Sequence, residues 1–142
     1  MNAFELIVPG ACVFFADQLT KSLAVRLLAK GRSVRLTSGV QIRLTTDTTR
    51  NRRSLVGRCA LLLLWASTLV GLILLIQHGD VFRHAVARLG LGAALGGAAS
   101  NLYDWLRRGT VIDLVKVGWW PVFNLADVGI TLGAILALWF IW

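Results

Sequence analysis

The amino-acid sequence predicts an all-α membrane protein with four transmembrane helices and a small β-hairpin between the first two helices. Composition is the first reason: 56% of the 142 residues are apolar and 15% are charged, whereas about a quarter of a soluble domain is charged. Length is the second reason, because a bilayer-spanning helix needs roughly 20 mainly apolar residues. We therefore expect one integral membrane domain, residues 1–142, with spans near residues 4–28, 55–77, 81–106 and 121–142.

The connection between the first and second spans is polar and basic. Arginine and lysine are concentrated in residues 30–58, so anionic lipid headgroups or a protein are candidate contacts for this segment. Within it, residues 33–46 alternate apolar and polar side chains, as half-exposed strands do, and Ser38-Gly39 supplies a turn signal. A β-hairpin is therefore predicted. No RNA- or DNA-binding motif accompanies the net charge of +8, so we expect no nucleic acid partner.

Small residues at helical spacing mark the third and fourth spans. Gly92 and Gly96 lie four residues apart in the third span, and Gly129 and Gly133 repeat that spacing in the fourth. In membranes such residues let helix backbones approach closely. The Arg-Arg-Gly run at residues 107–109 is expected to end the third helix, since cations and glycine are both favoured at helix C-termini.

Acidic residues in apolar spans indicate function, because each charge near the bilayer centre costs about 2.5–3.5 kcal/mol on insertion scales. The third and fourth spans are consecutive, so they are expected to be antiparallel, with the end of one beside the start of the other. The stretch between them, residues 110–120, is expected to be extended or irregular. This arrangement would bring the following polar residues to one end of the bundle: Asn101, Asp104, Asp113, Asn124 and Asp127, joined by Asp17 and Lys21 if the first span ends at the same face.

Two carboxylates in a partly dry site share a proton, because both cannot ionise easily. Such a pair can activate a water and protonate a leaving nitrogen, which are the two acts that peptide hydrolysis requires. Metal binding is the rival use of the acids. Metal ligands more often include histidine, and His78 and His84 fall at the opposite end of the bundle. We therefore expect no metal and no other cofactor.

Structural roles are also open to these residues. Asp104 can pair with the nearby Arg107 or Arg108. Asp17 and Lys21 are four residues apart, so they share a helix face. They are interpreted as a structural or substrate-positioning pair rather than a catalytic one.

Three motifs surround these polar residues. Residues 96–104 read GGAASNLYD and residues 107–113 read RRGTVID. The run FNLADVGI covers residues 123–130, and DQLTK covers residues 17–21. In this order they resemble the G-G-A-x-x-N-x-x-D…R-x-G-x-V-x-D, F-N-x-A-D-x-x-I and D-x-x-x-K boxes of the lipoprotein signal peptidase (signal peptidase II) family.

The resemblance implies a multi-pass aspartic endopeptidase of the bacterial cytoplasmic membrane. Such enzymes cleave prolipoprotein signal peptides just before the lipid-modified cysteine, contact membrane lipids and are inhibited by globomycin-type peptides. Matched by motif, Asp113 and Asp127 would be the catalytic pair that activates water. The remaining matched residues would support the site or bind substrate: Asn101, Asp104, Asn124, Asp17 and Lys21.

The resemblance also implies a side of the membrane for the hairpin. The family's hairpin lies outside the cytoplasmic membrane and cradles the substrate. The positive-inside rule alone would instead place the basic residues 30–58 in the cytoplasm. We follow the motifs, because the charge rule is a statistical bias.

Two departures from the family pattern leave other functions open. The family's N-x-G-x-A-F box is missing from residues 44–53, where Asn51 is the only asparagine, and Trp105 stands where an arginine usually follows the aspartate. The alternative is a non-catalytic paralogue that binds lipoproteins or signal peptides, although a binder has no reason to keep two costly acids. A proton-coupled transporter subunit is a third interpretation, against which the acids cluster at one end instead of lining a path.

Overall fold

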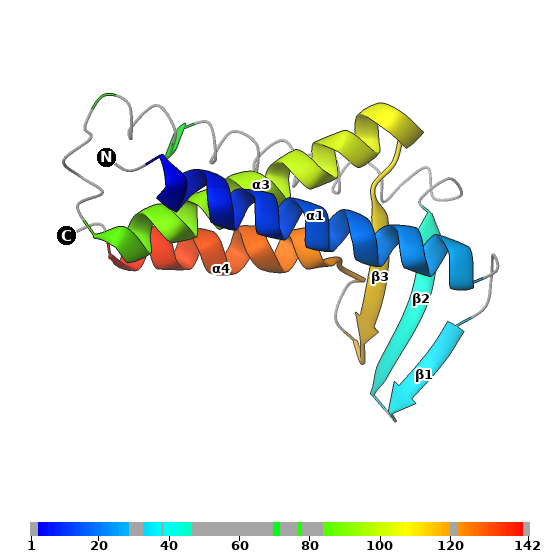
Figure 1. Ribbon diagram of the computed structural model, residues 1–142. Coiled ribbons are helices and arrows are strands. Elements are labelled where there is room, and N and C mark those ends of the chain that lie inside the picture. Colours follow the sequence, from blue (N-terminus) through cyan, green and yellow to red (C-terminus); the bar gives the residue numbers. More distant parts are fainter. Residues whose placement is uncertain are drawn as a thin grey trace.

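The computed structural model describes residues 3–28, 33–37, 39–46, 70–71, 77, 84–119 and 122–140. Its elements in chain order are α1 (Phe4–Leu27), β1 (Ser33–Thr37), β2 (Val40–Thr46), α3 (Ala85–Arg108), β3 (Ile112–Val117) and α4 (Leu125–Trp139). Most of the second expected span, and residues 47–58 of the basic segment, lie outside the described residues. The three helices lie side by side, and the sheet stands at one end of them (Figure 1).

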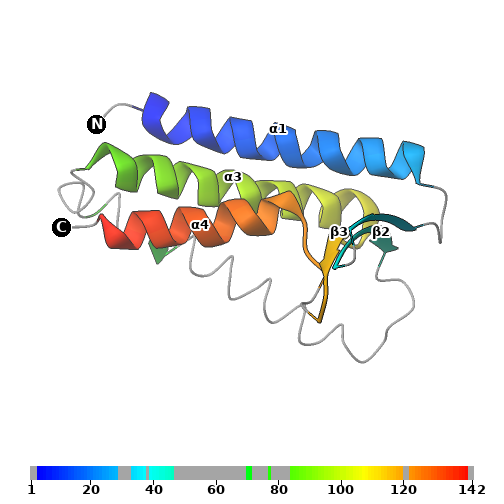
Figure 2. The same ribbon diagram turned by 90° about the horizontal axis from the view of Figure 1, so that it is seen from below.

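The helix directions bring three helix ends to the sheet. Both α1 and α4 pack mainly against α3, which lies between them in Figure 2. In both views α1 and α3 run toward the sheet and α4 runs away from it. The end of the third expected span therefore lies beside the start of the fourth, as the sequence predicts. Helix α3 begins at Ala85 and ends at Arg108, and α4 begins at Leu125, each within a few residues of the expected bounds.

Glycine allows the helices to approach one another closely. A Cβ atom added at Gly96 of α3 would lie 2.0 Å from the carbonyl oxygen of Gly10 in α1, and Gly92 faces α1 in the same way. On the other side of α3, a Cβ at Gly133 of α4 would lie 2.4 Å from the carbonyl oxygen of Gly90. No larger side chain fits these contacts. The packing role predicted for the small residues at the third and fourth spans is confirmed at these positions.

The sheet has three antiparallel strands in the order β1-β2-β3. Strands β1 and β2 form the predicted hairpin, in which Val34 pairs with Ile42. Strand β2 also pairs with β3, and this register sets Thr45 opposite Asp113. Most of the stretch expected to be extended or irregular is thus a regular strand. Its pairing joins the hairpin to the segment that carries Asp113.

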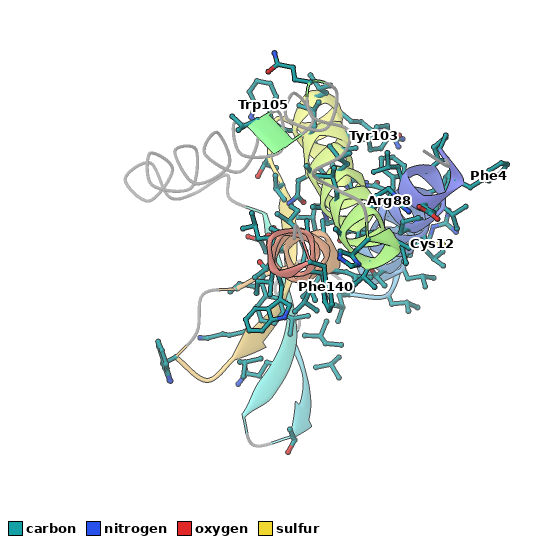
Figure 3. All side chains as sticks on the ribbon, turned by 90° about the vertical axis from the view of Figure 1, so that its left-hand side faces the viewer. Phe4, Cys12, Arg88, Tyr103, Trp105 and Phe140 are labelled. Atoms are coloured by element: carbon teal, nitrogen blue, oxygen red, sulfur yellow. The ribbon has the colours of Figure 1, made fainter. Side chains whose placement is uncertain are left out.

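Two charged side chains of α1 are fully buried, whereas several of its large apolar side chains are exposed. Asp17 and Lys21 of α1 are 0% exposed, whereas Phe4 is 78% and Phe15 is 68% exposed. Figure 3 shows Phe4 pointing away from the other helices. This distribution is expected when lipid, not water, surrounds the helices. Within the described residues α1 alone is long and apolar enough to cross a membrane, and the apolar α4 is shorter, with 15 residues.

Candidate active site

Helix α4 begins with a reciprocal cap that fixes Asp127 in place. Asn124 is the N-cap residue, and its side-chain oxygen accepts a hydrogen bond of 2.9 Å from the backbone N–H of Asp127. In return Asp127 Oδ2 accepts a 3.1 Å bond from the backbone N–H of Asn124. This capping box satisfies two backbone donors that would otherwise lack partners at the helix start.

The side-chain amide of Asn124 extends the contact to the second aspartate. Its Nδ2 donates to Asp113 Oδ1 at 3.2 Å and to the carbonyl oxygen of Ile112 at 3.3 Å. Asp113 lies on β3 and is partly buried, and Asn124 is 1% exposed. One asparagine therefore contacts both aspartates that the sequence selects as the catalytic pair, one through its side chain and the other through its backbone and cap.

Asn101 of α3 also contacts Asp127. Its Nδ2 donates to Asp127 Oδ1 at 2.9 Å. Its Oδ1 accepts bonds from Asn124 Nδ2 at 3.1 Å and from Lys21 Nζ at 3.0 Å. Each oxygen of the Asp127 carboxylate thus has a donor, and Asn101 is oriented from two sides. Because amides do not titrate near neutral pH, these contacts orient the carboxylate without taking its proton.

Lys21 lies at the centre of a buried cluster between α1 and α3. Its Nζ is 2.5 Å from Asp17 Oδ2 and 2.8 Å from Asp104 Oδ2. Asp17 also accepts bonds from the Ser100 hydroxyl at 2.7 Å and from the backbone N–H of Ala126 at 2.9 Å. The last contact reaches the first turn of α4, so the cluster connects α1, α3 and α4.

Two members of this cluster, Gln18 and Ser100, are not among the site residues predicted from the sequence. Gln18 Nε2 donates to Ser100 Oγ at 2.9 Å and to Asp104 Oδ1 at 3.1 Å. Each is the sequence neighbour of a selected residue, Gln18 beside Asp17 and Ser100 beside Asn101. Their polar side chains within otherwise apolar helices were the signal by which they could have been predicted.

Asp104 pairs with only one of the two arginines that follow it in the last turn of α3. Arg108 Nη1 donates to Asp104 Oδ1 at 2.9 Å. Arg107 instead donates to the Tyr103 hydroxyl at 2.9 Å. The neighbouring Trp105, which stands in the usual arginine position, is 49% exposed.

All seven selected residues come together at the sheet end of the bundle, and they fall into two groups. Asp113 and Asp127 contact the asparagines, and the remaining acids are engaged by Lys21 and Arg108. In the described ranges no group of three or more His, Cys, Asp or Glu residues is arranged to hold a metal ion. Of the two histidines, His84 precedes α3 at the end of the bundle far from the sheet, and His78 lies outside the described residues.

The chain is similar to known proteins over most of its length. The family model described as signal peptidase (SPase) II matches residues 10–142. A lipoprotein signal peptidase of Rhodococcus jostii (strain RHA1) is 42% identical, with 92% of this chain and 69% of the relative covered. One from Mycolicibacterium smegmatis is 40% identical over 92% of this chain, which spans 58% of that relative's length. A solved bacterial membrane enzyme shares the fold, with a TM-score of 0.72 at 23% identity over 93% of this chain and 88% of that one.

Proposed function

Because the chain belongs to the signal peptidase II family, we propose that it is a membrane aspartic endopeptidase that removes signal peptides from prolipoproteins. The bond cleaved is the amide just before a diacylglyceryl-modified cysteine. The names of the relatives, lipoprotein signal peptidases, support this substrate class. The observation that carries the catalytic part is the double contact of Asn124, with Asp113 through Nδ2 and with Asp127 through its backbone N–H.

The proposed reaction uses one ionised and one protonated carboxyl group. The ionised carboxylate takes a proton from a water as the water oxygen attacks the scissile carbonyl carbon. The protonated carboxyl donates to the carbonyl oxygen, so a neutral tetrahedral intermediate forms. When the C–N bond breaks, a proton passes to the leaving nitrogen. The products are a carboxyl group on the signal peptide and a free amine on the lipidated cysteine.

The surroundings of Asp127 and Asp113 differ, which suits a mechanism with one ionised and one protonated carboxyl group. Asp127 has a hydrogen-bond donor on each oxygen, from Asn101 and from the backbone of Asn124. Asp113 receives one bond from Asn124 and lies at the edge of the sheet, partly exposed. Two carboxylates held beside one residue cannot both ionise without cost, so one proton is shared between them.

The fold offers each part of the substrate a suitable environment. The strand β3 that carries Asp113 pairs with β2, so the hairpin β1-β2 lies next to the proposed cleavage point. The outward apolar side chains of the helices would face lipid, where the two acyl chains of the substrate can lie. As membership of the family implies, we propose that the site lies at the extracytoplasmic face of the bacterial inner membrane, in a multi-pass protein.

A gel-shift cleavage assay tests the proposal. Purified protein in detergent is given a diacylglyceryl-modified prolipoprotein, and Asp113→Asn and Asp127→Asn are compared with wild type. Both variants are expected to fold and to lose cleavage, because an amide can neither take the proton of water nor give one to the scissile carbonyl oxygen. Glu5→Gln is the matched control: it removes a carboxylate at the other end of α1, where Glu5 pairs with Arg88, and it should cleave as wild type does.

Two outcomes would reject the mechanism or the function. Full activity in either aspartate variant would remove the pair from the reaction. If folded wild type cleaved no lipidated substrate, the non-catalytic alternative that binds lipoproteins or signal peptides would be favoured. A parallel reaction with globomycin tests whether inhibition survives the loss of the N-x-G-x-A-F box.

A further inference from the structure

Four charged side chains meet between α1 and α3, beside the proposed aspartate pair. Lys21 contacts Asp17 at 2.5 Å and Asp104 at 2.8 Å, and all three are 0% exposed. Arg108 contacts the other oxygen of Asp104 at 2.9 Å, with 28% of its side chain exposed. The cluster therefore holds two carboxylates and two cations. It is neutral only when Arg108 is counted.

Neutrality matters because the other three charges are fully buried. A buried charge without a counter-charge is strongly unfavourable, whereas a balanced group of charges is tolerated. Without Arg108, a single Lys21 would face the carboxylates of both Asp17 and Asp104. The other described donor to Asp104, the amide of Gln18, is neutral. It can keep a hydrogen bond to the carboxylate, but it cannot balance the charge.

A continuous series of contacts connects Arg108 to the reaction site. Asp104 links Arg108 to Lys21, and Lys21 Nζ donates to Asn101 Oδ1 at 3.0 Å. Asn101 in turn donates to Asp127 Oδ1 at 2.9 Å. An unbalanced cluster would draw Lys21 toward the two carboxylates and weaken its bond to Asn101. The amide that orients Asp127 would then lose one of its two anchors.

We propose that Arg108 is a positioning residue of the aspartate site, which supplies the second positive charge of the buried cluster and thereby holds Asn101 against Asp127. The part of this proposal that is tested by kcat rests on the proposed peptidase function. It also gives this chain a cation beside Asp104 although Trp105 stands at the position where the family usually has arginine.

An ordinary ion pair on a helix surface would have little effect. Pairs four residues apart on exposed helices contribute about 0.3–0.5 kcal/mol, and cations near a helix C-terminus add a similar amount. Arg107 has both of these surface features: it lies in the last turn of α3, and its guanidinium is exposed over the ring of Tyr103, 5.8 Å from the centroid. It differs from Arg108 in that its described contacts include no buried carboxylate. Arg107→Gln is therefore the matched control, with the same charge change one residue away.

The experiment compares Arg108→Gln, Arg108→Lys and Arg107→Gln in the cleavage assay and in thermal melts in detergent. We expect kcat to fall by up to about 100-fold in Arg108→Gln, the loss that a misplacement of about 1 Å at a reacting group can cause, with KM little changed. Arg108→Lys should recover most of the rate, because it restores the charge. Arg107→Gln should match wild type in both assays. The double variant Asp104→Asn/Arg108→Gln, whose buried charges are again balanced, should melt higher than Arg108→Gln alone.

Each outcome decides the proposal. It is overturned if Arg108→Gln behaves as Arg107→Gln does, or if Arg108→Lys is no better than Arg108→Gln. If Arg108→Gln does not fold, folding of both the double variant and Arg108→Lys supports the charge balance, and failure of both refutes it. If folded wild type cleaves nothing, the proposed function fails separately. The melting temperatures of the same four variants then still test whether Arg108 neutralises the cluster.

Discussion

Substitutions of Asn124 should separate its role as the N-cap of α4 from its contact with Asp113. It caps the helix through its side-chain oxygen and contacts Asp113 through its side-chain nitrogen. Replacing it by alanine removes both functions. Replacing it by aspartate keeps a good N-cap oxygen for the backbone N–H of Asp127. It also puts a negatively charged oxygen where Nδ2 donates to Asp113, so it keeps the cap, removes the contact with Asp113 and adds repulsion between the two carboxylates.

The size of the effect follows from the bonds that are lost. An N-cap replaced by alanine costs about 1 kcal/mol. The acceptors on Ile112 and Asp113 each lose a donor, at about 1 kcal/mol apiece. Asn101 Oδ1 keeps its bond from Lys21, so its loss adds little. Asn124→Ala should therefore lower stability by about 3 kcal/mol, which corresponds to a fall in Tm on the order of 10 °C for a chain of this size.

The assay is cleavage of a lipidated prolipoprotein beside a thermal melt in the same detergent. Both variants should lose most of kcat, because each leaves Asp113 without the amide that orients it. Asn124→Asp should do so while α4 stays capped. Wild-type kcat in the folded Asn124→Asp protein would show that the amide contact with Asp113 plays no part in catalysis. A loss of activity in Asn124→Ala alone would reduce the role of Asn124 to helix capping.

Two further predictions concern packing and buried charge. Gly96→Ala should lower Tm through overpacking of about 1–3 kcal/mol, because its Cβ would lie 2.0 Å from the Gly10 oxygen. Gly39→Ala, where nothing lies within 4 Å, should melt as wild type does, and equal melting of the two variants would contradict the close approach of α1 and α3. Lys21→Met should cost about 3–5 kcal/mol, because it leaves two buried carboxylates without their shared cation. Melting at the wild-type temperature would show that the cluster does not depend on Lys21.

The sequence predicted that the polar residues of the site meet at one end of the bundle, because the patterns that imply it are local in the chain. Glycine spacing indicated which helices pack closely, and the consecutive order of the last two spans implied that Asn101 and Asp127 meet. The hairpin followed from alternation and the turn at Gly39. Nothing local, however, distinguished Arg108 from Arg107 as the partner of Asp104. That choice depends on which side of α3 faces α1, which is a property of the packed bundle.

The pairing of β3 with the hairpin was missed for a similar reason. Residues 112–117 read IDLVKV, a short run that suits a strand or a connector equally well. Only the neighbouring edge of β2 decides between them, because a strand needs a partner for its backbone hydrogen bonds. The partner lies some 70 residues earlier in the chain, beyond the reach of any periodicity.

The position of Asp127 in a capping box has a consequence for how the site is held. The same carboxylate that is proposed to handle the proton also satisfies the backbone N–H of Asn124. Movement of the Asp127 carboxylate would therefore break one of the two bonds of the capping box, and fraying of the first turn of α4 would move Asp127. Asp113 lies on a strand and contacts α4 through the Asn124 amide. The two carboxylates are thus held by different elements, Asp127 by the helix that it starts and Asp113 by strand β3.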